Sequence, residues 1–451
     1  MSKFLKITVV LVGVAIATGA GMYWYGRINK LNEDLQAKEV MLSWNRLLME
    51  LERFTSGYRA PVSARMFAYT ALTAYEAALP GNSGYRSLGA DFGGYDPIPY
   101  NNEVKHFLPA ASLNTAYAAM ARKFFPGAPV PLQDRINELE KYFTEKNNGA
   151  TDETSLAFSR NYGRRTAENL WRWSQTDSVG YGGPAFCREC GYKPDTIKGH
   201  WRSDDENLTP PLLPYWGKVR SFVTAPGDTP SQPPAPYDEA PGSLMYGEAM
   251  EVFTSAQPLN SESHQISEFW SDDITEFTVS PTGRWISIAT QAAERSDLSA
   301  AQTLEMYLRL SFALCDAYIV CWDLKYQYMA ERPQTYISRV IQPEWRPYAP
   351  SPPYPSYPAA HATVAAAAAE VLIYSFGDPY PFTDRTHEGR EEFAGTPRSY
   401  QSFRDMSKEI ALSRILLGVH FRMDCEEGLR IGTMIGERVN VLSIQQVEPY
   451  K

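Results

Sequence analysis

Apolar residues recur at helical spacing along most of this chain. Between Lys30 and Phe54, apolar side chains such as Trp44 and Leu51 recur among charged ones in the pattern of a helix that buries one face. No alternating run of comparable length predicts a strand, so the chain is expected to be mainly α. The helical segments that follow are Ala60 to Leu79, Leu113 to Phe125, Leu132 to Asn147, Ser155 to Ser174, Tyr246 to Ala256, Ser261 to Asp273, Trp285 to Arg295, Ser299 to Met329, His361 to Phe376, and Ser402 to about Arg438.

Two stretches rich in glycine and proline interrupt this pattern. The first runs from Gly180 to about Gly242, and the second runs from Pro343 to Pro358. Proline does not continue a helix, so both are predicted to be connections, and the first is either an ordered loop or a domain junction. We therefore divide the chain into an N-terminal helical region, residues 29–245, with the long loop 180–242, and a C-terminal helical bundle, residues 246–451.

The first 28 residues are predicted to be a targeting segment. Lys3 and Lys6 precede an uncharged stretch from Ile7 to Tyr25, which is about the length of one bilayer crossing. An uncleaved signal anchor is favoured over a cleaved signal peptide, because Thr18-Gly19-Ala20 is a weak cleavage site. The body of the protein is expected outside the cytoplasm, in the periplasm or cell envelope, either anchored to the membrane or secreted.

The charge balance narrows the range of partners. The 451-residue chain has a formal net charge of -9, and its basic residues form no run. A nucleic acid or an anionic membrane surface requires a basic patch, so neither is expected as a partner. Positive charge that binds a small anion must then be concentrated locally.

The five cysteines fall into two groups. Cys187 and Cys190 have a spacing that suits either a local disulfide or half of a zinc site. A zinc site needs two more ligands and His200 is the only histidine nearby, so a loop-stiffening disulfide is favoured. The others lie in apolar helical stretches and are expected to be core thiols: Cys315, Cys321 and Cys425.

Two segments of the C-terminal third carry basic groups that suit an anion. Lys325 precedes Arg332 by seven residues, or two helical turns, so both side chains are expected on one helical face. A proline-rich loop leads to His361 at the start of an alanine-rich helix, where free backbone N–H groups favour an anion. Each feature alone also fits a solvated basic face or a capping histidine.

A third segment reads Ser413-Arg414-Ile-Leu-Leu-Gly-Val-His420-Phe-Arg-Met-Asp424. Asp424 follows His420 by four residues, which predicts that both lie on one face of a helix. A carboxylate there can hold the Nδ1 proton of His420 and present Nε2 as a nucleophile or a metal ligand. The alternative is a buried histidine–aspartate pair that only satisfies the core.

In this order and at these spacings, the three segments resemble the signature shared by the vanadium-dependent haloperoxidases and the type 2 phosphatidic acid phosphatases. The resemblance is specific from about Trp322 to Gly436. Looser similarity at Glu268 to Asp272 and at Ser280 to Trp285 looks like that of bacterial exported members of the haloperoxidase-like family. The resemblance implies a helical bundle of the haloperoxidase and acid phosphatase type with long proline-rich loops.

The resemblance also implies roles for individual residues. His420 matches the residue that bonds to vanadium or phosphorus, and His361 matches the acid–base histidine on the opposite side. Asp424 matches the residue that orients the nucleophile in the phosphatases, and Ala360 supplies a backbone N–H to the anion. Lys325, Arg332 and Arg414 match the residues that neutralise the oxygens of the anion. One site can serve both reactions, because vanadate bound to one histidine stably adopts the trigonal bipyramid of phosphoryl transfer.

Three positions bear on which reaction occurs. Trp322 matches an aromatic residue near the halide position of the chloroperoxidases, and ordinary aromatic core is an equal alternative. Tyr354 stands where chloroperoxidases carry phenylalanine and bromoperoxidases carry histidine, so halide preference stays open, and this side chain also fits ordinary core. Ala359 replaces the serine of the usual Pro-Ser-Gly-His. The loss of that hydroxyl destabilises an anionic transition state by about 2 to 4 kcal/mol.

Three functions are compatible with this chain. The first is a haloperoxidase that holds vanadate at His420 and oxidises halide with hydrogen peroxide. The second is a metal-independent acid phosphatase that hydrolyses a phosphoric monoester or a lipid phosphate through a phosphohistidine at His420, without a cofactor. The third is a non-catalytic, envelope-tethered phosphate or vanadate binder, which Ala359 and the N-terminal anchor suggest. A di-iron site is excluded because only one Glu-x-x-His pair occurs, Glu103 to His106.

Overall fold

The computed structural model describes residues 30–445 except 59, 83, 101–103, 178, 182–190, 204–208, 257–260, 273, 275 and 391–394. The targeting segment and the Cys187–Cys190 pair lie outside the described residues, so both stay predictions. Within the described part of the chain, no helix is both long and apolar enough to cross a membrane.

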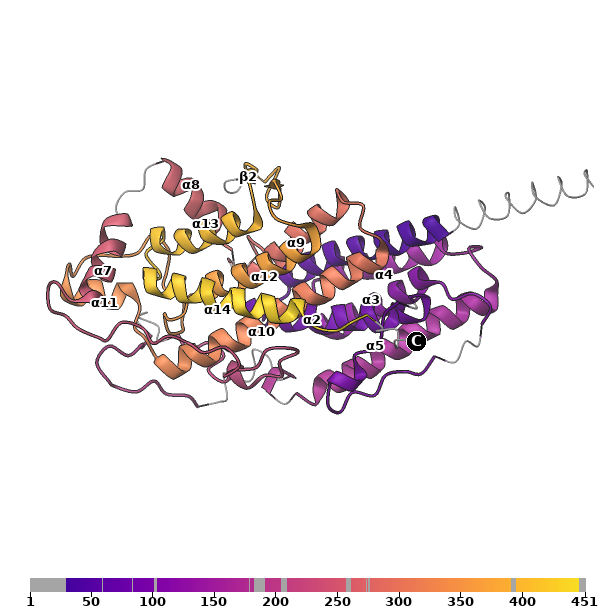
Figure 1. Cartoon of the computed structure of the whole chain (residues 1–451), viewed down its shortest axis with the longest axis horizontal. Helices are drawn as coiled ribbons and strands as arrows, with labels where there is room; N and C mark the ends of the chain where they lie inside the picture. Colours follow the sequence, from indigo (N-terminus) through magenta and orange to yellow (C-terminus); the bar gives the residue numbers. More distant parts are fainter. Residues whose placement is uncertain are drawn as a thin grey trace, which may run out of the picture.

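The described chain is mainly α, as the apolar periodicity predicts, and its long helices run along the long axis of the molecule (Figure 1). A first helix occupies residues 30–54. The helices that follow are α2 (Ala60–Ala78), α3 (Pro109–Phe124), α4 (Val130–Lys146), α5 (Glu153–Gln175), α7 (Leu244–Ser255), α8 (Ser261–Phe269), α9 (Pro281–Glu294), α10 (Ala300–Tyr328), α11 (Pro333–Val340), α12 (Ala360–Phe376), α13 (Phe403–Leu416) and α14 (Arg422–Asn440).

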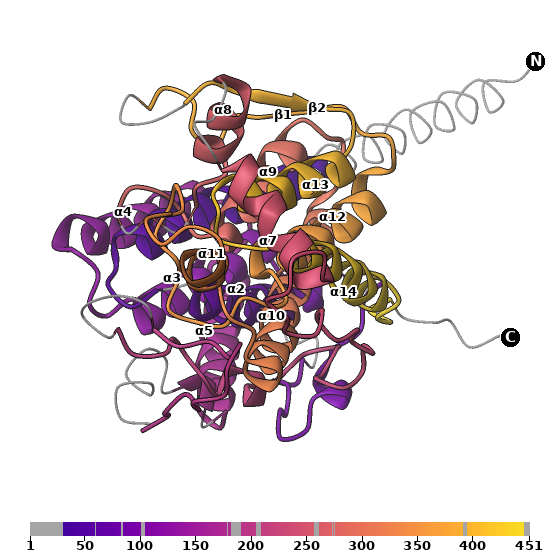
Figure 2. The ribbon, with the colours of Figure 1, turned by 90° about the vertical axis from the view of Figure 1, so that its left-hand side faces the viewer.

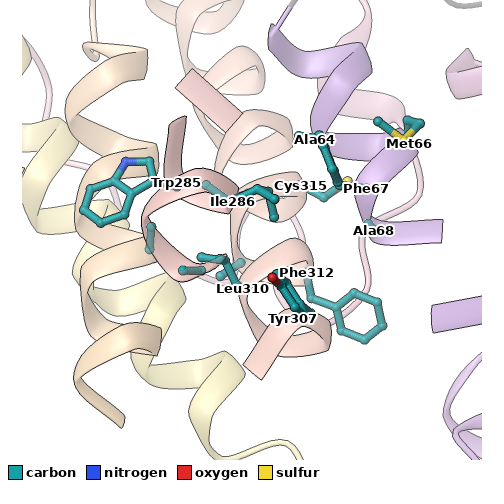
Figure 3. Close-up of a cluster of buried hydrophobic side chains, with 14 of the residues drawn as sticks. Ala64, Met66, Phe67, Ala68, Trp285, Ile286, Tyr307, Leu310, Phe312 and Cys315 are labelled. Carbon is teal, nitrogen blue, oxygen red and sulfur yellow. The ribbon is translucent and has the colours of Figure 1, made fainter. Parts of the chain in front are cut away.

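Helix α10 lies at the centre of the bundle because it is apolar on nearly every side. Its side chains are buried over most of its length, and it packs against α2, α9, α12 and α14. Figure 3 shows part of this core, in which Leu310 and Phe312 of α10 lie in one cluster with Phe67 of α2 and Trp285 of α9. A helix of this kind belongs in the core of a large protein. The cluster contains side chains from both predicted regions, and the division at residue 245 stays a prediction.

Helices α12 and α14 pack side by side because glycines of α14 leave room for the backbone of α12 (Figure 2). A Cβ atom on Gly428 would lie 2.7 Å from the carbonyl oxygen of Ala359, and one on Gly432 would lie 2.1 Å from that of Thr363. Because both series of contacts advance in the same direction, the two helices run parallel. Their N-terminal ends therefore lie at the same end of the bundle, where both helix dipoles are positive.

The single last helix predicted from Ser402 to about Arg438 is wrong, because the structure has two helices, α13 and α14. The break covers residues 417–421, where Gly418 has a φ of 77°, a conformation that glycine adopts without strain. A Cβ atom on Gly418 would lie 3.0 Å from Pro347 and 3.1 Å from Trp345. His420 therefore lies in a turn and not on a helix.

The interpretation of Lys325 and Arg332 as neighbours on one helical face is also wrong. Helix α10 ends at Tyr328, and Met329 then adopts a left-handed backbone with φ 52°. Arg332 is the N-cap of α11, a short helix that the periodicity did not predict. The chain turns between the two basic residues, so any contact they share depends on tertiary structure.

Two short strands, β1 (Phe382–Asp384) and β2 (Arg398–Tyr400), pair antiparallel and were not predicted. Strands of three residues are too short to show a visible alternation.

The described parts of loop 180–242 are attached to the bundle and contain the 3-10 turn Trp216–Lys218. Asp316 of α10 accepts hydrogen bonds from three successive backbone N–H groups of this loop, at 2.8, 2.7 and 2.7 Å. Further along, the N–H of Gln232 donates to Glu427 of α14 at 2.7 Å, and its carbonyl accepts from the hydroxyl of Tyr357 at 2.5 Å. The described parts of the loop are therefore held by contacts with helices, and the choice between an ordered loop and a domain junction stays a prediction.

Candidate active site

The basic residues that the sequence singled out converge at one end of the bundle. They come from five segments: Lys325 from the last turn of α10, Arg332 before α11, His361 from the first turn of α12, Arg414 from the last turn of α13, and His420 from the turn before α14. The charges of Arg332, Lys325 and Arg414 all lower the pKa of His420, so the three cations lie near it. His361 is partly buried, and the other four side chains are buried.

Lys325 is bound to the loop that leads to His361. Its Nζ donates to the carbonyl oxygens of Pro355, Ser356 and Pro358 at 2.9, 2.8 and 2.6 Å. These contacts occupy the three N–H bonds of the ammonium group. Burial lowers the pKa of Lys325. The residue thus ties the end of α10 to the loop, and a bound anion would share one of its protons.

Arg332 is fully buried and directs its guanidinium toward His420. Its Nε donates to the carbonyl oxygen of Tyr354 at 2.9 Å. Its Nη1 donates to the carbonyl oxygen of Val419 at 2.8 Å and lies 3.0 Å from Nε2 of His420. Its Nη2 is buried and has no hydrogen-bond partner among the described residues. Because an unpaired buried donor is costly, this atom marks a place for an oxygen ligand.

Asp424 orients His420 across the turn and not along a helical face. Oδ2 of Asp424 lies 3.0 Å from Nδ1 of His420 and accepts from the N–H of Phe421 at 3.1 Å. A carboxylate in this position favours the tautomer with the proton on Nδ1, which leaves the Nε2 lone pair facing Arg332. Burial, Arg332 and Lys325 hold the pKa of His420 well below 6.5. The imidazole is therefore neutral and able to act as a ligand or nucleophile through Nε2.

Ser356 belongs to this site, although the spacing of the motif did not identify it. Its hydroxyl donates to Oδ2 of Asp424 at 2.5 Å and lies 3.4 Å from Nδ1 of His420. Its side chain is fully buried. The signal in the sequence was one polar residue in an otherwise apolar, proline-rich segment. A loop has no regular repeat, so the sequence does not show where this side chain points.

His361 presents a second neutral imidazole. Its Nε2 is buried and has no hydrogen-bond partner among the residues that the structure describes. Burial and the charge of Arg414 hold its pKa well below 6.5, and Asp272 acts in the opposite direction. The neutral ring therefore leaves Nε2 available to a molecule bound beside it, as a donor or an acceptor according to its tautomer.

Arg414 joins the site to a second buried group of charges. Its Nε donates to the hydroxyl of Ser413 at 3.0 Å, and its Nη2 donates to the carbonyl oxygen of Trp270. Burial lowers its pKa to about 10, and Asp272 opposes this shift. Asp272 pairs with the buried Arg284 at 3.0 Å. The sequence analysis named Asp272 only as the end of a segment similar to the haloperoxidase-like family. The signal for a role was a carboxylate close to aromatic residues in that segment.

Trp322 and Tyr354 form an aromatic wall beside two of the cations. Their ring centroids lie 5.0 Å apart. The ring of Tyr354 lies 5.1 Å from Nζ of Lys325 and 4.9 Å from Cζ of Arg332, which are cation–π distances. Both aromatic side chains are buried. The two rings therefore belong to the core and to the wall of the site at once.

Ala359 and Ala360 occupy the start of α12 where the family signature has serine and glycine. Ala359 is the N-cap and offers no side-chain hydrogen bond. Its N–H donates to the carbonyl oxygen of Asp424 at 2.9 Å. The N–H groups of the first helical turn, which Ala360 begins, have no acceptor within the helix and suit an anion.

A cleft of about 410 Å³ is lined by residues close in sequence to Tyr354 and Arg332. Its wall includes Pro353, which precedes Tyr354, and Gln334, which lies in the first turn after Arg332. This volume is in the usual range for small-molecule pockets. The five basic residues do not line the cleft.

The side chains present fit an oxyanion better than a metal cation. In the described ranges, no group of three or more His, Cys, Asp and Glu side chains could hold a metal ion. Three buried cations, two neutral histidines and the unpaired Nη2 of Arg332 instead suit a tetrahedral anion such as vanadate or phosphate.

A mainly α bundle with buried cations gathered around histidines at its helix ends is the architecture of the helical haloperoxidase class. Comparison with known proteins agrees: residues 305–448 match the family described as the VCPO second helical-bundle domain. Over these residues the chain is similar to the vanadium haloperoxidase superfamily.

Solved structures have a similar fold. The structure described as the first bacterial vanadium-dependent iodoperoxidase is 27% identical, with a TM-score of 0.80 over 91% of this chain and 98% of that chain. The holo form of a bacterial vanadium-dependent chloroperoxidase is 16% identical, with a TM-score of 0.65 over 85% of this chain and 92% of that chain, and so shares the fold. No curated protein sequence gives a significant match.

Proposed function

We propose that this protein is a vanadium-dependent haloperoxidase-like enzyme that holds vanadate at His420 and oxidises halide with hydrogen peroxide. The observation that carries the proposal is a pair of buried nitrogens without protein partners, Nη2 of Arg332 and Nε2 of His361, in the described part of a strongly cationic site. An oxyanion would accept a hydrogen bond from Nη2 of Arg332, and its negative charge would offset the positive charge of the site. The vanadium-dependent structures that this chain resembles support the choice of vanadate.

Each residue has a distinct task in this proposal. His420 offers the lone pair of Nε2 to the centre of the anion, and Asp424 keeps the proton on Nδ1. Arg332 and Arg414 balance the negative charge of the oxygens, and Lys325 shares one of its protons with them. His361 accepts the proton that hydrogen peroxide loses on binding. When bound, vanadate activates hydrogen peroxide toward attack by halide.

Trp322 and Tyr354 are proposed to border the halide position. Their rings lie beside Lys325 and Arg332, so an anion near them is attracted by positive charge while one side is apolar. A large polarisable halide loses less hydration energy on entering such a place than a small one. The resemblance to a structure described as an iodoperoxidase also favours iodide as the first halide to test.

The decisive experiment supplies the purified protein with orthovanadate, hydrogen peroxide and either iodide or bromide. Oxidised halide is followed as triiodide or as bromination of an indicator dye, and vanadate-dependent turnover is expected. His420→Ala removes the proposed ligand and should abolish turnover. His106→Ala changes an exposed histidine that pairs with Glu33, and it should leave turnover intact. Activity no higher than that of His420→Ala would reject the proposal.

A metal-independent acid phosphatase is the second candidate, and the His420–Asp424 contact favours it. That contact leaves Nε2 of His420 as a nucleophile for phosphorus, and His361 could protonate the leaving group. This function predicts hydrolysis of an aryl phosphate without added metal, inhibition by vanadate, and a trapped phosphohistidine that is absent from His420→Ala.

A non-catalytic binder is the third candidate, and Ala359 favours it because one anion donor is missing. Tight phosphate or vanadate binding by calorimetry, together with no turnover in either assay, would support this candidate over the two enzymes.

We further propose that the protein acts outside the cytoplasm, through the apolar segment at Ile7 to Tyr25. Fractionation of expressing cells tests this location, and recovery of the full chain in the cytoplasmic fraction would contradict it.

A further inference from the structure

Ser356 contacts both Lys325 and Asp424. It lies in the proline-rich loop before α12, and its side chain has no exposed surface. Its hydroxyl donates to Oδ2 of Asp424 at 2.5 Å and lies 3.4 Å from Nδ1 of His420. The first of these distances lies at the short end of the range of charge-assisted hydrogen bonds between a hydroxyl and a carboxylate.

The two oxygens of Asp424 have unequal surroundings. Oδ2 receives the hydroxyl of Ser356, Nδ1 of His420 and the N–H of Phe421. Oδ1 is buried and has no hydrogen-bond partner among the described residues. Two of the donors to Oδ2 belong to the turn that Asp424 itself follows. Of these three donors, Ser356 alone comes from a distant part of the chain, so it fixes the carboxylate relative to the rest of the site.

The backbone of Ser356 is fixed independently of its side chain. Its carbonyl oxygen accepts from Nζ of Lys325 at 2.8 Å, and its N–H donates to the carbonyl oxygen of Ala330 at 2.9 Å. Both partners belong to the segment at the end of α10, and Pro355 restricts the chain before Ser356. The position of the Ser356 side chain is therefore determined by the contacts of its backbone with the end of α10.

We propose that Ser356 is a positioning residue whose hydroxyl holds the Asp424 carboxylate against Nδ1 of His420, so that Nε2 faces the anion. This role rests on the proposed function only where anion binding is measured. The orientation of His420 in the free protein follows from the contacts alone.

Loss of the hydroxyl leaves Oδ2 with two donors, Nδ1 of His420 and the N–H of Phe421, both from the adjacent turn, so the carboxylate is held less firmly relative to the rest of the site. The ring of His420 can then turn, and it keeps a lone pair on whichever nitrogen faces Nη1 of Arg332. A mixed population of tautomers presents Nε2 less often as a lone pair. Affinity for an anion that binds at Nε2 should fall by roughly tenfold, the usual effect of losing a hydrogen bond to a charged group.

The test compares Ser356→Ala with Ser112→Ala. Ser112 is a fully buried serine of α3 whose hydroxyl donates to the carbonyl oxygen of Ala77 at 2.7 Å, away from the site. Both variants lose one buried hydroxyl, so a merely structural effect is matched. The chain has six histidines, and nitrogen-15 histidine spectra of the free protein report each tautomer. His420 is assigned by its absence from His420→Ala.

We expect the Nδ1-protonated tautomer of His420 in the wild type and in Ser112→Ala, and a mixture in Ser356→Ala. Orthovanadate and inorganic phosphate titrations should show roughly tenfold weaker binding for Ser356→Ala alone. Ser356→Thr, which keeps the hydroxyl, should restore both properties. If Ser356→Ala does not fold, Ser356→Cys retains the volume with a weaker donor, and the same mixture is expected.

Wild-type tautomer and affinity in Ser356→Ala or Ser356→Cys would overturn the positioning role. If the wild type binds neither vanadate nor phosphate, the proposed function fails, while the tautomer comparison still decides the role of Ser356. The two failures are therefore distinct.

Discussion

Nη1 of Arg332 lies 3.0 Å from Nε2 of His420, although the two residues are 88 positions apart in the chain. Each of them lies outside a regular helix, one before α11 and the other before α14. The contact places a permanent positive charge next to the nitrogen that we propose as the vanadate ligand. Such a pair attracts an anion to the lone pair of His420 before any bond forms.

Arg332→Lys should weaken vanadate and phosphate binding by roughly 10- to 100-fold. Lysine keeps the charge but cannot contact Tyr354, Val419 and an anion with the fixed fork of a guanidinium. Calorimetric titration measures the change. Arg122→Lys, on the exposed pair with Glu140, is the control and should bind as the wild type does. Unchanged affinity in Arg332→Lys would remove the guanidinium from the anion site.

Ala359→Ser should raise both stability and turnover. A serine oxygen at the N-cap of α12 can accept from a backbone N–H of the first turn, which stabilises a helix by about 1 kcal/mol. Its hydrogen remains available to an anion, and recovery of one such donor should raise turnover by at least about tenfold. Thermal unfolding without anion separates the first effect from steady-state kinetics. A more stable variant with unchanged turnover would show that the missing hydroxyl does not limit the reaction.

Gly432→Ala should destabilise the protein by about 1 to 3 kcal/mol, because the new Cβ would lie 2.1 Å from the carbonyl oxygen of Thr363. Helices α12 and α14 must then separate, which moves His361 away from the turn that carries His420. Urea unfolding measures the loss. Gly247→Ala in α7, where a Cβ atom meets nothing within 4 Å, should be neutral or slightly stabilising. Equal stability of both variants would contradict close packing at Gly432.

Protonation of Glu76 should make the stability of the protein depend on pH. Glu76 lies in α2 with 2% of its surface exposed, and burial raises its pKa from 4.5 to about 7. Because the folded-state pKa is the higher one, the carboxyl contributes stability fully below pH 4.5. That contribution of about 3 kcal/mol declines as the pH rises and is lost above about pH 7.

Glu76→Gln cannot ionise and should flatten this decline, as urea unfolding at about pH 5 and about pH 8 would measure. Glu138→Gln, on the exposed side of α4, should keep the wild-type slope. The idea fails if Glu76→Gln shows the same loss of stability with pH as the wild type.

The helices were predictable because a buried face imposes its period on the local sequence. The predicted segments Ser155 to Ser174 and Ser299 to Met329 correspond to Glu153–Gln175 and Ala300–Tyr328. Boundaries shift by one or two residues because a few capping atoms determine them. Helix α11 was missed since eight residues carry little periodic signal.

The motif identified the members of the site more reliably than their geometry. Lys325, Arg332 and His420 do converge, but the helical faces expected to align them do not exist. Ser356 was missed because a loop residue reveals no direction. The role of each residue in catalysis stays a prediction.

Local sequence was sufficient for the mainly α class and for the chain order of the basic residues, because helical period and residue type are properties of short segments. The convergence of those residues depends on contacts between distant segments. Gly418 turns the chain against Trp345, and Gly432 admits the backbone of Thr363, so His420 and His361 reach the same end of the bundle. Such contacts arise from packing in three dimensions, and no local period encodes them.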